Sequence, residues 1–410
     1  MVTDTAVRTG AGRDFRLFWT GDVVSQFGSR ITEFVLPLLV VTTLDGSGTQ
    51  VGLLQGLYLC PFFLLPLLAG VWLERRTKRP VMIAADLVRF VLVMAVPVLA
   101  LFGLLTLPLL YVIAVAGGTM TVVHDIAATS YLPLLVEGEV LASANSGILA
   151  GQAAGATGGP GLAGWLSALF GPAATLVFDG LSYLASANAL LLIRHREQVP
   201  PRPRRELRRE LVERLRAVLH NPPVRALAVH AGIYNAATAM TTVAFLVHFV
   251  RGLGHSSAAY GLIMVCGGLG GISGALATPA LIRRLGYGRS MLVVLVFSTW
   301  SYFLLPLAGG GQVDVVLCGL AYFLGSAGAA GGTVVALTVR QKTTPPELLA
   351  RMNASYRLFA FGMLSLGSVA AGFLVDGIGA RTTLFVTPVL LVISAIPAAS
   401  RPVRTIRELD

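Results

Sequence analysis

The sequence predicts an all-α membrane protein in which twelve transmembrane helices form two parallel six-helix repeats around a central cavity. Three observations support this fold class. Of the 410 residues, 55% are hydrophobic and only 12% are charged, whereas soluble proteins carry roughly 25% charged residues. The apolar residues form long runs separated by Gly, Pro or charge. The two halves of the chain also match each other at a nearly constant offset.

Twelve apolar runs are long enough to cross a bilayer, because a helix needs about 20 residues to span roughly 30 Å of hydrocarbon. The first six predicted spans cover 15–43, 51–73, 81–103, 109–131, 142–168 and 174–193. The second six cover 223–250, 259–282, 290–308, 314–339, 351–375 and 382–399. These spans divide the chain into an N-terminal half (1–193), a cytoplasmic linker (194–222) and a C-terminal half (223–410).

The linker 194–222 is the one long connection. It contains nine arginines and a series of apolar residues at helical spacing, Leu207, Leu211, Leu215 and Val218. This pattern predicts an amphipathic helix. Its basic face either binds anionic lipid or a regulatory partner, or is simply solvated beside the membrane.

Basic residues gather on one side of the predicted bundle. In the connections on the opposite side, Arg251 and Arg381 are the only two. Because positive charge stays in the cytoplasm, both termini are predicted to be cytoplasmic. The preference for arginine over lysine is typical of a GC-rich bacterial genome, and we expect a multi-pass protein of the bacterial plasma membrane.

Several functions are excluded by what the sequence lacks. The two lysines, Lys78 and Lys342, do not follow a glycine, so there is no phosphate-binding G-x-x-x-x-G-K-[ST] loop to drive transport with ATP. The three cysteines, Cys60, Cys266 and Cys318, lie in apolar runs without metal-binding spacing. The net charge of +11 does not indicate nucleic-acid binding, because most of the chain is predicted to lie in lipid. No cofactor, metal site or enzymatic activity is expected.

An internal duplication relates the two halves. An offset of 208 to 209 residues aligns Gly52 with Gly261, Arg75 with Arg284, Asn145 with Asn353, Gly159 with Gly367 and Gly171 with Gly379. Two six-helix halves whose termini lie on one side are parallel repeats, an arrangement known for transporters that rock two halves about a central site.

A basic loop between the second and third spans contains Gly70, Glu74, Arg75, Lys78 and Arg79. It resembles the loop signature of the major facilitator superfamily, G-x-x-x-D-[RK]-x-G-[RK]-[RK], with Glu74 in place of Asp and threonine in place of the second glycine. An acid beside a basic cluster forms an ion pair that can break, so we expect a cytoplasmic gate here. The alternative is that the charges only set topology.

The fifth span contains Gly155, Gly159, Pro160 and Gly164. This is similar to the antiporter motif of drug/proton exporters, G-x8-G-x3-G-P-x2-G-G, with Ser146 and Ala163 in place of two of its glycines. Small residues every four positions let helices pack closely, and a proline bends the helix. Plain helix packing is the alternative interpretation.

Further stretches resemble the macrolide-efflux and enterobactin-exporter branch of this superfamily, namely Phe15 to Trp19, Asp125 to Pro133, Asn145 and Phe178 to Tyr183. The resemblance implies a secondary transporter that works by alternating access. It would export a hydrophobic or amphipathic small molecule, such as a drug, antibiotic or siderophore, in exchange for protons, and would function as a monomer.

Polar residues inside spans are costly and therefore candidates for function. In the first span, Asp22, Gln26, Arg30 and Glu33 form one helical stripe. By the duplication, its counterpart is the face of the seventh span that carries His230 and Tyr234. Arg30 and Glu33 alternatively form a static bridge, and His230 alternatively serves in packing.

The third and fourth spans add four more candidates, Asp86, Arg89, His124 and Asp125. We expect Asp22 and Asp125 to carry protons and substrate, because a carboxyl group taken out of water binds a proton and releases it when a cation arrives. Asp125 alternatively serves a helix interface. Asp86 and Arg89, one turn apart, are expected to support the cytoplasmic gate.

Three rival functions remain open. A proton-coupled importer of the same fold is disfavoured by the antiporter-like fifth span. A non-transporting receptor or scaffold would have to signal through the linker 194–222. A membrane enzyme lacks the H-E-x-x-H motif that a metal-dependent protease would need.

Overall fold

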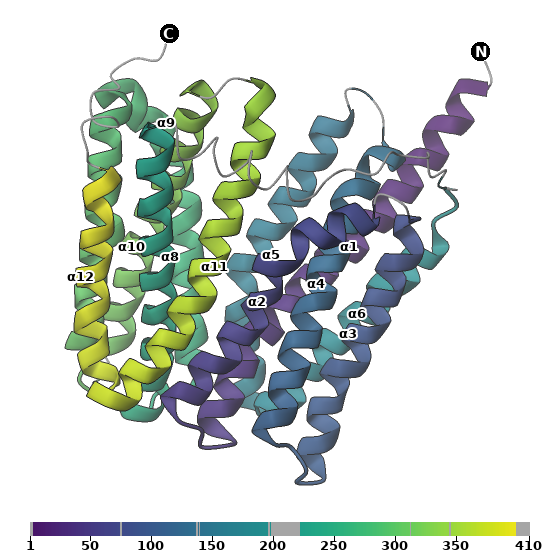
Figure 1. Ribbon diagram of the computed structural model, residues 1–410. Helices are drawn as coiled ribbons and strands as arrows, with labels where there is room; N and C mark the ends of the chain where they lie inside the picture. Colours follow the sequence, from purple (N-terminus) through teal and green to yellow (C-terminus); the bar gives the residue numbers. More distant parts are fainter. Residues whose placement is uncertain are drawn as a thin grey trace. The chain divides into compact units, whose positions relative to one another are not determined.

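The computed structural model describes residues 3–73, 76–136, 138, 140–195, 197, 222–311, 313–343 and 346–398 (Figure 1). All regular secondary structure in these ranges is helical, which confirms the prediction of an all-α protein. Glu74, Arg75 and the predicted amphipathic helix at 207–218 lie outside the described residues.

The helices follow the order of the predicted spans. The first group is α1 (Thr3–Thr42), α2 (Gly48–Leu73), α3 (Lys78–Leu101), α4 (Leu107–Leu135), α5 (Val140–Phe170) and α6 (Pro172–Leu192). The second group is α8 (Pro222–Leu246), the π-helix η1 (Val247–Gly252), α9 (Ser257–Trp300), the 3-10 helix η2 (Ser301–Leu307), α10 (Val313–Thr343), α11 (Pro346–Ile378) and α12 (Ala380–Ala398). Within the described ranges, eight helices are long and apolar enough to cross a membrane.

The predicted spans 259–282 and 290–308 correspond to one long element, α9 with η2. Its backbone is broken at Gly286, where φ is 75° and ψ is 171°. Only glycine adopts this conformation readily, because it has no Cβ atom. The glycine therefore separates two helical rods at the place where the sequence predicts a connection.

The internal repeat is visible in the turns that precede α6 and α12. Gly171 and Gly379, which the offset of 208 aligns, have φ values of 84° and 86°. One turn later, Thr175 and Thr383 each donate a side-chain hydrogen bond of 2.9 Å to the carbonyl oxygen of the respective glycine. The duplicated sequence thus produces the same local structure twice.

The chain divides into two compact units. Unit 1 comprises Met1–Leu39 and Cys60–Arg204, and unit 2 comprises Val40–Leu59 and Arg205–Asp410. The segment Val40–Leu59, which contains the α1–α2 loop, therefore groups with the helices that follow the linker. A domain boundary within 194–222 stays a prediction.

In unit 1, the small residues of α5 pack against α1. Gly147 lies beside Trp19, Gly151 beside Val23, and Gly159 beside Arg30, and the last two glycines leave no room for a Cβ atom. Successive contacts advance by four residues or multiples of four along α5, and by four or seven along α1, as expected for two closely packed helices. The glycines of the antiporter-like motif thus position the polar stripe of α1.

In unit 2, α8 and α11 form the equivalent interface. Gly367, which the duplication aligns with Gly159, packs directly on the backbone of Ala236. Phe359 of α11 presses on Gly232 of α8, whereas the residue that aligns with Phe359 in unit 1, Gly151 of α5, lies against Val23 of α1. The large residue is on α11 in unit 2 and on α1 in unit 1, and the glycine is on the opposite helix in each case. Close packing is preserved in both repeats.

Unit 2 also holds the α1–α2 loop. Arg251 in η1 donates hydrogen bonds to the carbonyl oxygens of Val41 (3.0 Å) and Gly46 (2.7 Å). Its guanidinium group lies 3.4 Å from the carboxylate of Asp45. One of the two basic residues predicted on this side is therefore bound to the loop.

The first turn of α2 is capped by another helix. The carboxylate of Asp376, near the end of α11, accepts hydrogen bonds from the backbone N–H groups of Gly48 (2.7 Å) and Thr49 (2.8 Å). A negative charge at a helix N-terminus satisfies unpaired donors and is favoured by the helix dipole. This contact joins the start of α2 to α11.

The glycine packing leads to a test of stability. We expect Gly367→Ala to lower the free energy of unfolding by roughly 1–3 kcal/mol, because the added methyl group overlaps the Ala236 backbone and forces α8 and α11 apart. Thermal unfolding of the purified protein in detergent measures this loss. Gly271→Ala in α9 is the matched control, since a Cβ atom there meets nothing within 4 Å. Equal unfolding temperatures for the two variants would contradict the packing argument.

Candidate functional site

The polar stripe of α1 contains one buried acid and one ion pair. Asp22 is 6% exposed, and its carboxylate is hydrogen-bonded to the side chain of Gln26. Arg30 donates a hydrogen bond of 2.7 Å to Glu33, and both side chains are about one-third exposed. The Arg30–Glu33 bridge, one of the two alternatives from the sequence, is present. Among the residues that the structure describes, Asp22 is the acid of the stripe without an ion-pair partner.

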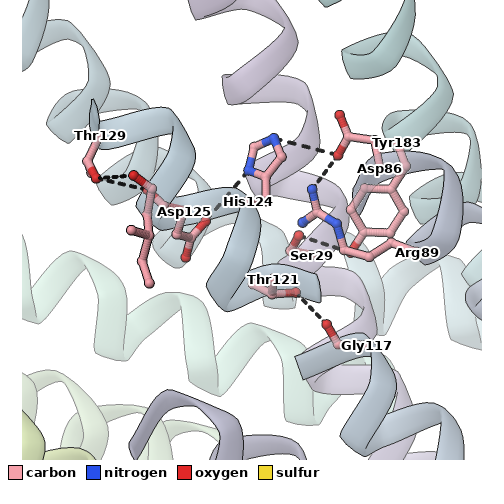
Figure 2. Close-up of polar contacts among 10 residues, drawn as sticks. Ser29, Asp86, Arg89, Gly117, Thr121, His124, Asp125, Thr129 and Tyr183 are labelled. Carbon is pink, nitrogen blue, oxygen red and sulfur yellow. Dashed lines mark hydrogen bonds and ion pairs between the residues drawn. The ribbon is translucent and has the colours of Figure 1, made fainter. Parts of the chain in front are cut away.

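A second group of ionisable residues comes from α3 and α4 (Figure 2). Asp86 and Arg89 form an ion pair, and both residues are buried. His124 is also buried, with its Nε2 atom 3.6 Å from Asp86 Oδ1 and its Nδ1 atom 3.8 Å from Asp125 Oδ1. The side chain of Asp125 is 45% exposed. A histidine thus lies between a buried acid and an exposed one.

Residues of α6 and α1 surround the Arg89 guanidinium group. It lies over the ring of Tyr183, 4.3 Å from the ring centroid, and the Tyr183 hydroxyl is 3.1 Å from the hydroxyl of Ser29 (Figure 2). Asp179 is fully buried and accepts a hydrogen bond from Thr32. These contacts tie the ion pair on α3 to the polar face of α1.

A small residue permits this contact between α1 and α6. A Cβ atom at Gly28 would overlap the side chains of Ser182 and Asp179. Ser182 donates a hydrogen bond of 3.1 Å to Asp179. The glycine therefore leaves room for polar side chains that satisfy one another between the two helices.

We call Asp22, Asp86, Arg89, His124, Asp125 and Asp179 the acid cluster. The electrostatic interactions of Asp22 include His124, Asp125 and Arg89, and those of Arg89 include Asp86, Asp125 and Asp179. Four carboxyl groups thus share one guanidinium group and one imidazole. Full ionisation of all four acids in a bundle with little water is unfavourable. Chemically, the cluster is suited to bind protons or a cation.

The threonines of α4 that share a face with Asp125 are satisfied within their own helix. Thr121 and Thr129 donate side-chain hydrogen bonds of 3.0 Å to the carbonyl oxygens of Gly117 and Asp125, respectively (Figure 2). Such bonds to the preceding turn are common for threonine in helices. They leave the carboxyl group as the ionisable element of this face.

The predicted gate loop is partly described. Gly70 lies in the last turn of α2. The N–H groups of Lys78 and Arg79 donate to the carboxylate of Glu197 at 2.6 and 2.7 Å, and the Arg79 side chain donates to the carbonyl oxygens at the end of α6. Lys78 and Arg79 thus join the start of α3 to the end of α6. Asp86 and Arg89, which the sequence assigned to the same gate, belong to the acid cluster, and a gating role for any of these residues stays a prediction.

The counterpart of the stripe in α8 makes contacts to neighbouring groups of unit 2. His230, which the offset of 208 aligns with Asp22, donates a hydrogen bond of 2.8 Å from Nδ1 to the carbonyl oxygen of Ser394. Its ring centroid lies 5.6 Å from that of Tyr234, whose hydroxyl is hydrogen-bonded to Thr238 and Ser298. These contacts agree with the packing alternative for His230.

The fifth-span motif has a structural part in the site. Gly155 and Gly159 are buried, and Pro160 and Gly164 follow them inside α5. Gly155 faces the backbone of Gln26 and Gly159 faces Arg30. The motif thus sets the distance at which α1 presents its stripe, as the packing interpretation expects.

Sequence reasoning missed the connections between helices. It did not place Asp86 beside His124, or Asp179 beside Thr32. Two signals were available, because Asp86 and Arg89 are three residues apart on α3, and Asp179 and Tyr183 are four apart on α6. In the ranges that the structure describes, no group of three or more His, Cys, Asp or Glu residues is arranged to hold a metal ion.

Comparisons with known proteins agree with this architecture. The chain is 27% identical over 403 residues to the multidrug efflux pump Tap of Mycolicibacterium fortuitum, covering 93% of this chain and 94% of Tap. It is 30% identical over 287 residues to the uncharacterized MFS-type transporter y4rN of Sinorhizobium fredii, covering 66% and 67% of the two chains.

Solved structures share the fold at low sequence identity. A bacterial homologue of the iron transporter ferroportin in its inward-facing state matches with a TM-score of 0.76 and 18% identity over 94% of this chain and 97% of that chain. The nucleoside transporter NupG matches with a TM-score of 0.75 and 12% identity over 93% and 97% of the respective chains.

The family assignment rests on the sequence itself. A model of the Major Facilitator Superfamily matches residues 18–360, which is most of the chain. The resemblance of the loop and fifth-span motifs to this superfamily is therefore confirmed, and the protein is a membrane transporter rather than an enzyme. The chain belongs to the Major Facilitator Superfamily.

Proposed function

We propose that this transporter exports a hydrophobic or amphipathic small molecule, such as a drug, antibiotic or siderophore, in exchange for protons. Transport proceeds by alternating access to a central cavity between two six-helix repeats. Asp22 and Asp125 carry protons and substrate, and the loop from Gly70 to Arg79 gates the cytoplasmic face.

The acid cluster is the observation that supports proton exchange most directly. Four carboxyl groups and one guanidinium group lie together in unit 1. The ionised acids exceed the positive charge, and binding of protons reduces this excess. A cationic or polar substrate near Asp125 favours the ionised acids and displaces those protons. Binding of substrate and of protons then exclude each other, as antiport requires.

The direction and substrate class rest on relatives. Tap, a multidrug efflux pump, resembles this chain over nearly its full length, and this favours export over import. An amphipathic substrate is consistent with the stripe of α1, where Gln26 and the Arg30–Glu33 pair lie among apolar residues.

The proposed topology completes the transporter. Twelve spans cross the bacterial plasma membrane, with the α9 element contributing two rods on either side of Gly286. Both termini and the basic linker lie in the cytoplasm, as the distribution of arginines favours. One chain is sufficient for transport, because it contains both six-helix repeats.

Replacing the acids tests proton coupling. We expect Asp22→Asn and Asp125→Asn each to lower pH-gradient-driven uptake into inverted vesicles by roughly tenfold or more, because an amide does not bind the transported proton. The assay uses a compound selected from a panel of labelled amphipathic drugs and siderophores by its uptake with the wild-type protein. Asp45→Asn, in the exposed α1–α2 loop, is the control and retains uptake. Wild-type uptake by both cluster variants would remove these acids from the mechanism.

The direction of transport is tested separately. An exporter driven by protons accumulates the compound in inverted vesicles that are acidic inside, and does not accumulate it in right-side-out vesicles with an acidic exterior. Uptake is measured in both preparations with the wild-type protein and with empty-vector membranes. Proton-driven accumulation only in right-side-out vesicles would show import instead.

A further inference from the structure

The two ring nitrogens of His124 face carboxyl groups in different surroundings. Nε2 lies 3.6 Å from Asp86, whose side chain is completely buried, and Nδ1 lies 3.8 Å from Asp125, whose side chain is 45% exposed. The imidazole itself is only 4% exposed. His124 thus lies between an exposed acid, Asp125, and a buried acid, Asp86 (Figure 2).

We propose that His124 relays protons between Asp125 and Asp86, and that the Asp86–Arg89 ion pair, rather than Asp125 alone, is the element that converts proton binding into movement. This inference rests on the proposed function, since it names the path of the exchanged proton. It assigns Asp86 and Arg89 to coupling instead of to the cytoplasmic gate.

The chemistry of imidazole suits this path. A neutral ring accepts a proton on one nitrogen and releases one from the other, and it does so near physiological pH. Protonated Asp125 gives its proton to Nδ1, forming imidazolium, and the proton on Nε2 then passes to Asp86. Asp125 ends ionised and Asp86 neutral, and the ring is left as the other tautomer, which returns by the reverse steps or by turning over.

The two distances from His124 to Asp86 and Asp125 correspond to a state in which no proton is being transferred. Both gaps exceed the usual 2.7–3.2 Å of a hydrogen bond that involves nitrogen. Small changes in the side-chain torsions of His124 and Asp125 shorten one gap at a time. The two proton transfers therefore take place one after the other and not through a continuous chain of hydrogen bonds. Substrate bound at Asp125, the exposed end of the path, blocks the first transfer.

Neutralising Asp86 frees Arg89 from its ion pair. Within the described part of the chain, Asp86 Oδ2 and Arg89 Nε make no hydrogen bond, so the pair is held by a single contact between the two side chains. Without it, the guanidinium group keeps Tyr183 and the more distant Asp125 and Asp179 as its interaction partners. A buried cation that loses its counterion is driven to rearrange.

A rearrangement of Arg89 can reach the polar stripe of α1 through the contacts of α6. Tyr183 contacts Ser29, and Asp179 binds Thr32. Both of these partners are on α1, which also carries Asp22, Arg30 and Glu33. Proton arrival on Asp86 is therefore transmitted to α1 through α6.

Several charged or titratable groups act on His124 together. Asp22 of α1, Asp86 of α3 and Asp125 of α4 interact with it directly. Arg89 of α3, with Asp179 and Tyr183 of α6, follows behind Asp86.

Two transport assays in proteoliposomes separate the relay from the rest of the mechanism. pH-gradient-driven accumulation requires proton transfer, whereas exchange of labelled for unlabelled substrate at equal pH on both sides does not. We expect His124→Gln to lower accumulation by about tenfold or more while exchange stays within about twofold of wild type, because glutamine hydrogen-bonds but carries no proton. His195→Gln is the control, since His195 binds Asp14 through its backbone N–H, and it retains both activities.

A second variant tests the same inference in case His124→Gln does not fold. Asp86→Asn combined with Arg89→Gln removes both charges of the buried pair, so neither is left without a counterion. We expect the same loss of accumulation with exchange retained. Combining His124→Gln with Asp125→Asn causes no greater loss than either alone, because the two residues act in series on one path.

The outcomes distinguish this inference from the proposed function. If wild-type protein shows no accumulation driven by a pH gradient, proton antiport itself is wrong. Thermal unfolding checks that the His124→Gln variant is correctly folded. If a pH gradient drives accumulation equally well in the wild-type protein and in this folded variant, the relay is overturned. Multiplied losses in the double variant would likewise place His124 and Asp125 on separate paths.

Discussion

A polar group inside an apolar helical bundle has few partners other than neighbouring side chains, and this constraint shapes unit 1. The ion pair of Asp86 and Arg89 is buried in this unit, with no exposed surface on Asp86 and 2% on Arg89. Such a pair persists only where surrounding groups satisfy the remaining charge. Tyr183 and His124 are two of these surrounding groups, and they come from different helices. The side chains around one buried ion pair therefore link α3, α4 and α6.

Close approach of backbones makes this arrangement possible. Gly159 lets α5 contact α1, and Gly28 lets the polar side chains of α6 meet the same helix. Helices in membranes gain little from the hydrophobic effect against each other, so packing and hydrogen bonds must hold them. The glycines of the fifth-span motif therefore serve helix packing. Its glycines bring α1 to the depth at which Ser29 and Thr32 reach α6.

The two repeats use the same framework for different purposes. Gly171 and Gly379 form matching turns, and the α1–α5 interface of unit 1 has its equivalent between α8 and α11 in unit 2. Yet Asp22 belongs to a cluster of acids, whereas the aligned His230 binds a backbone carbonyl group. Duplication preserves the packing surfaces, because both halves must fold, and leaves the polar positions free to diverge. The proton chemistry that we propose is accordingly concentrated in one repeat.

The sequence alone determined the helical class, the internal repeat and the superfamily, because apolar run length, glycine spacing and the offset between halves are local or periodic properties. It also selected Asp22, Asp125 and the Arg30–Glu33 bridge, since each depends on spacing along one helix. Which helices meet was decided only by the tertiary structure. The placement of His124 between Asp86 and Asp125, and the bond between Asp179 and Thr32, depend on the rotation and depth of separate helices. Those quantities follow from close packing across the whole unit, and no single stretch of sequence contains them.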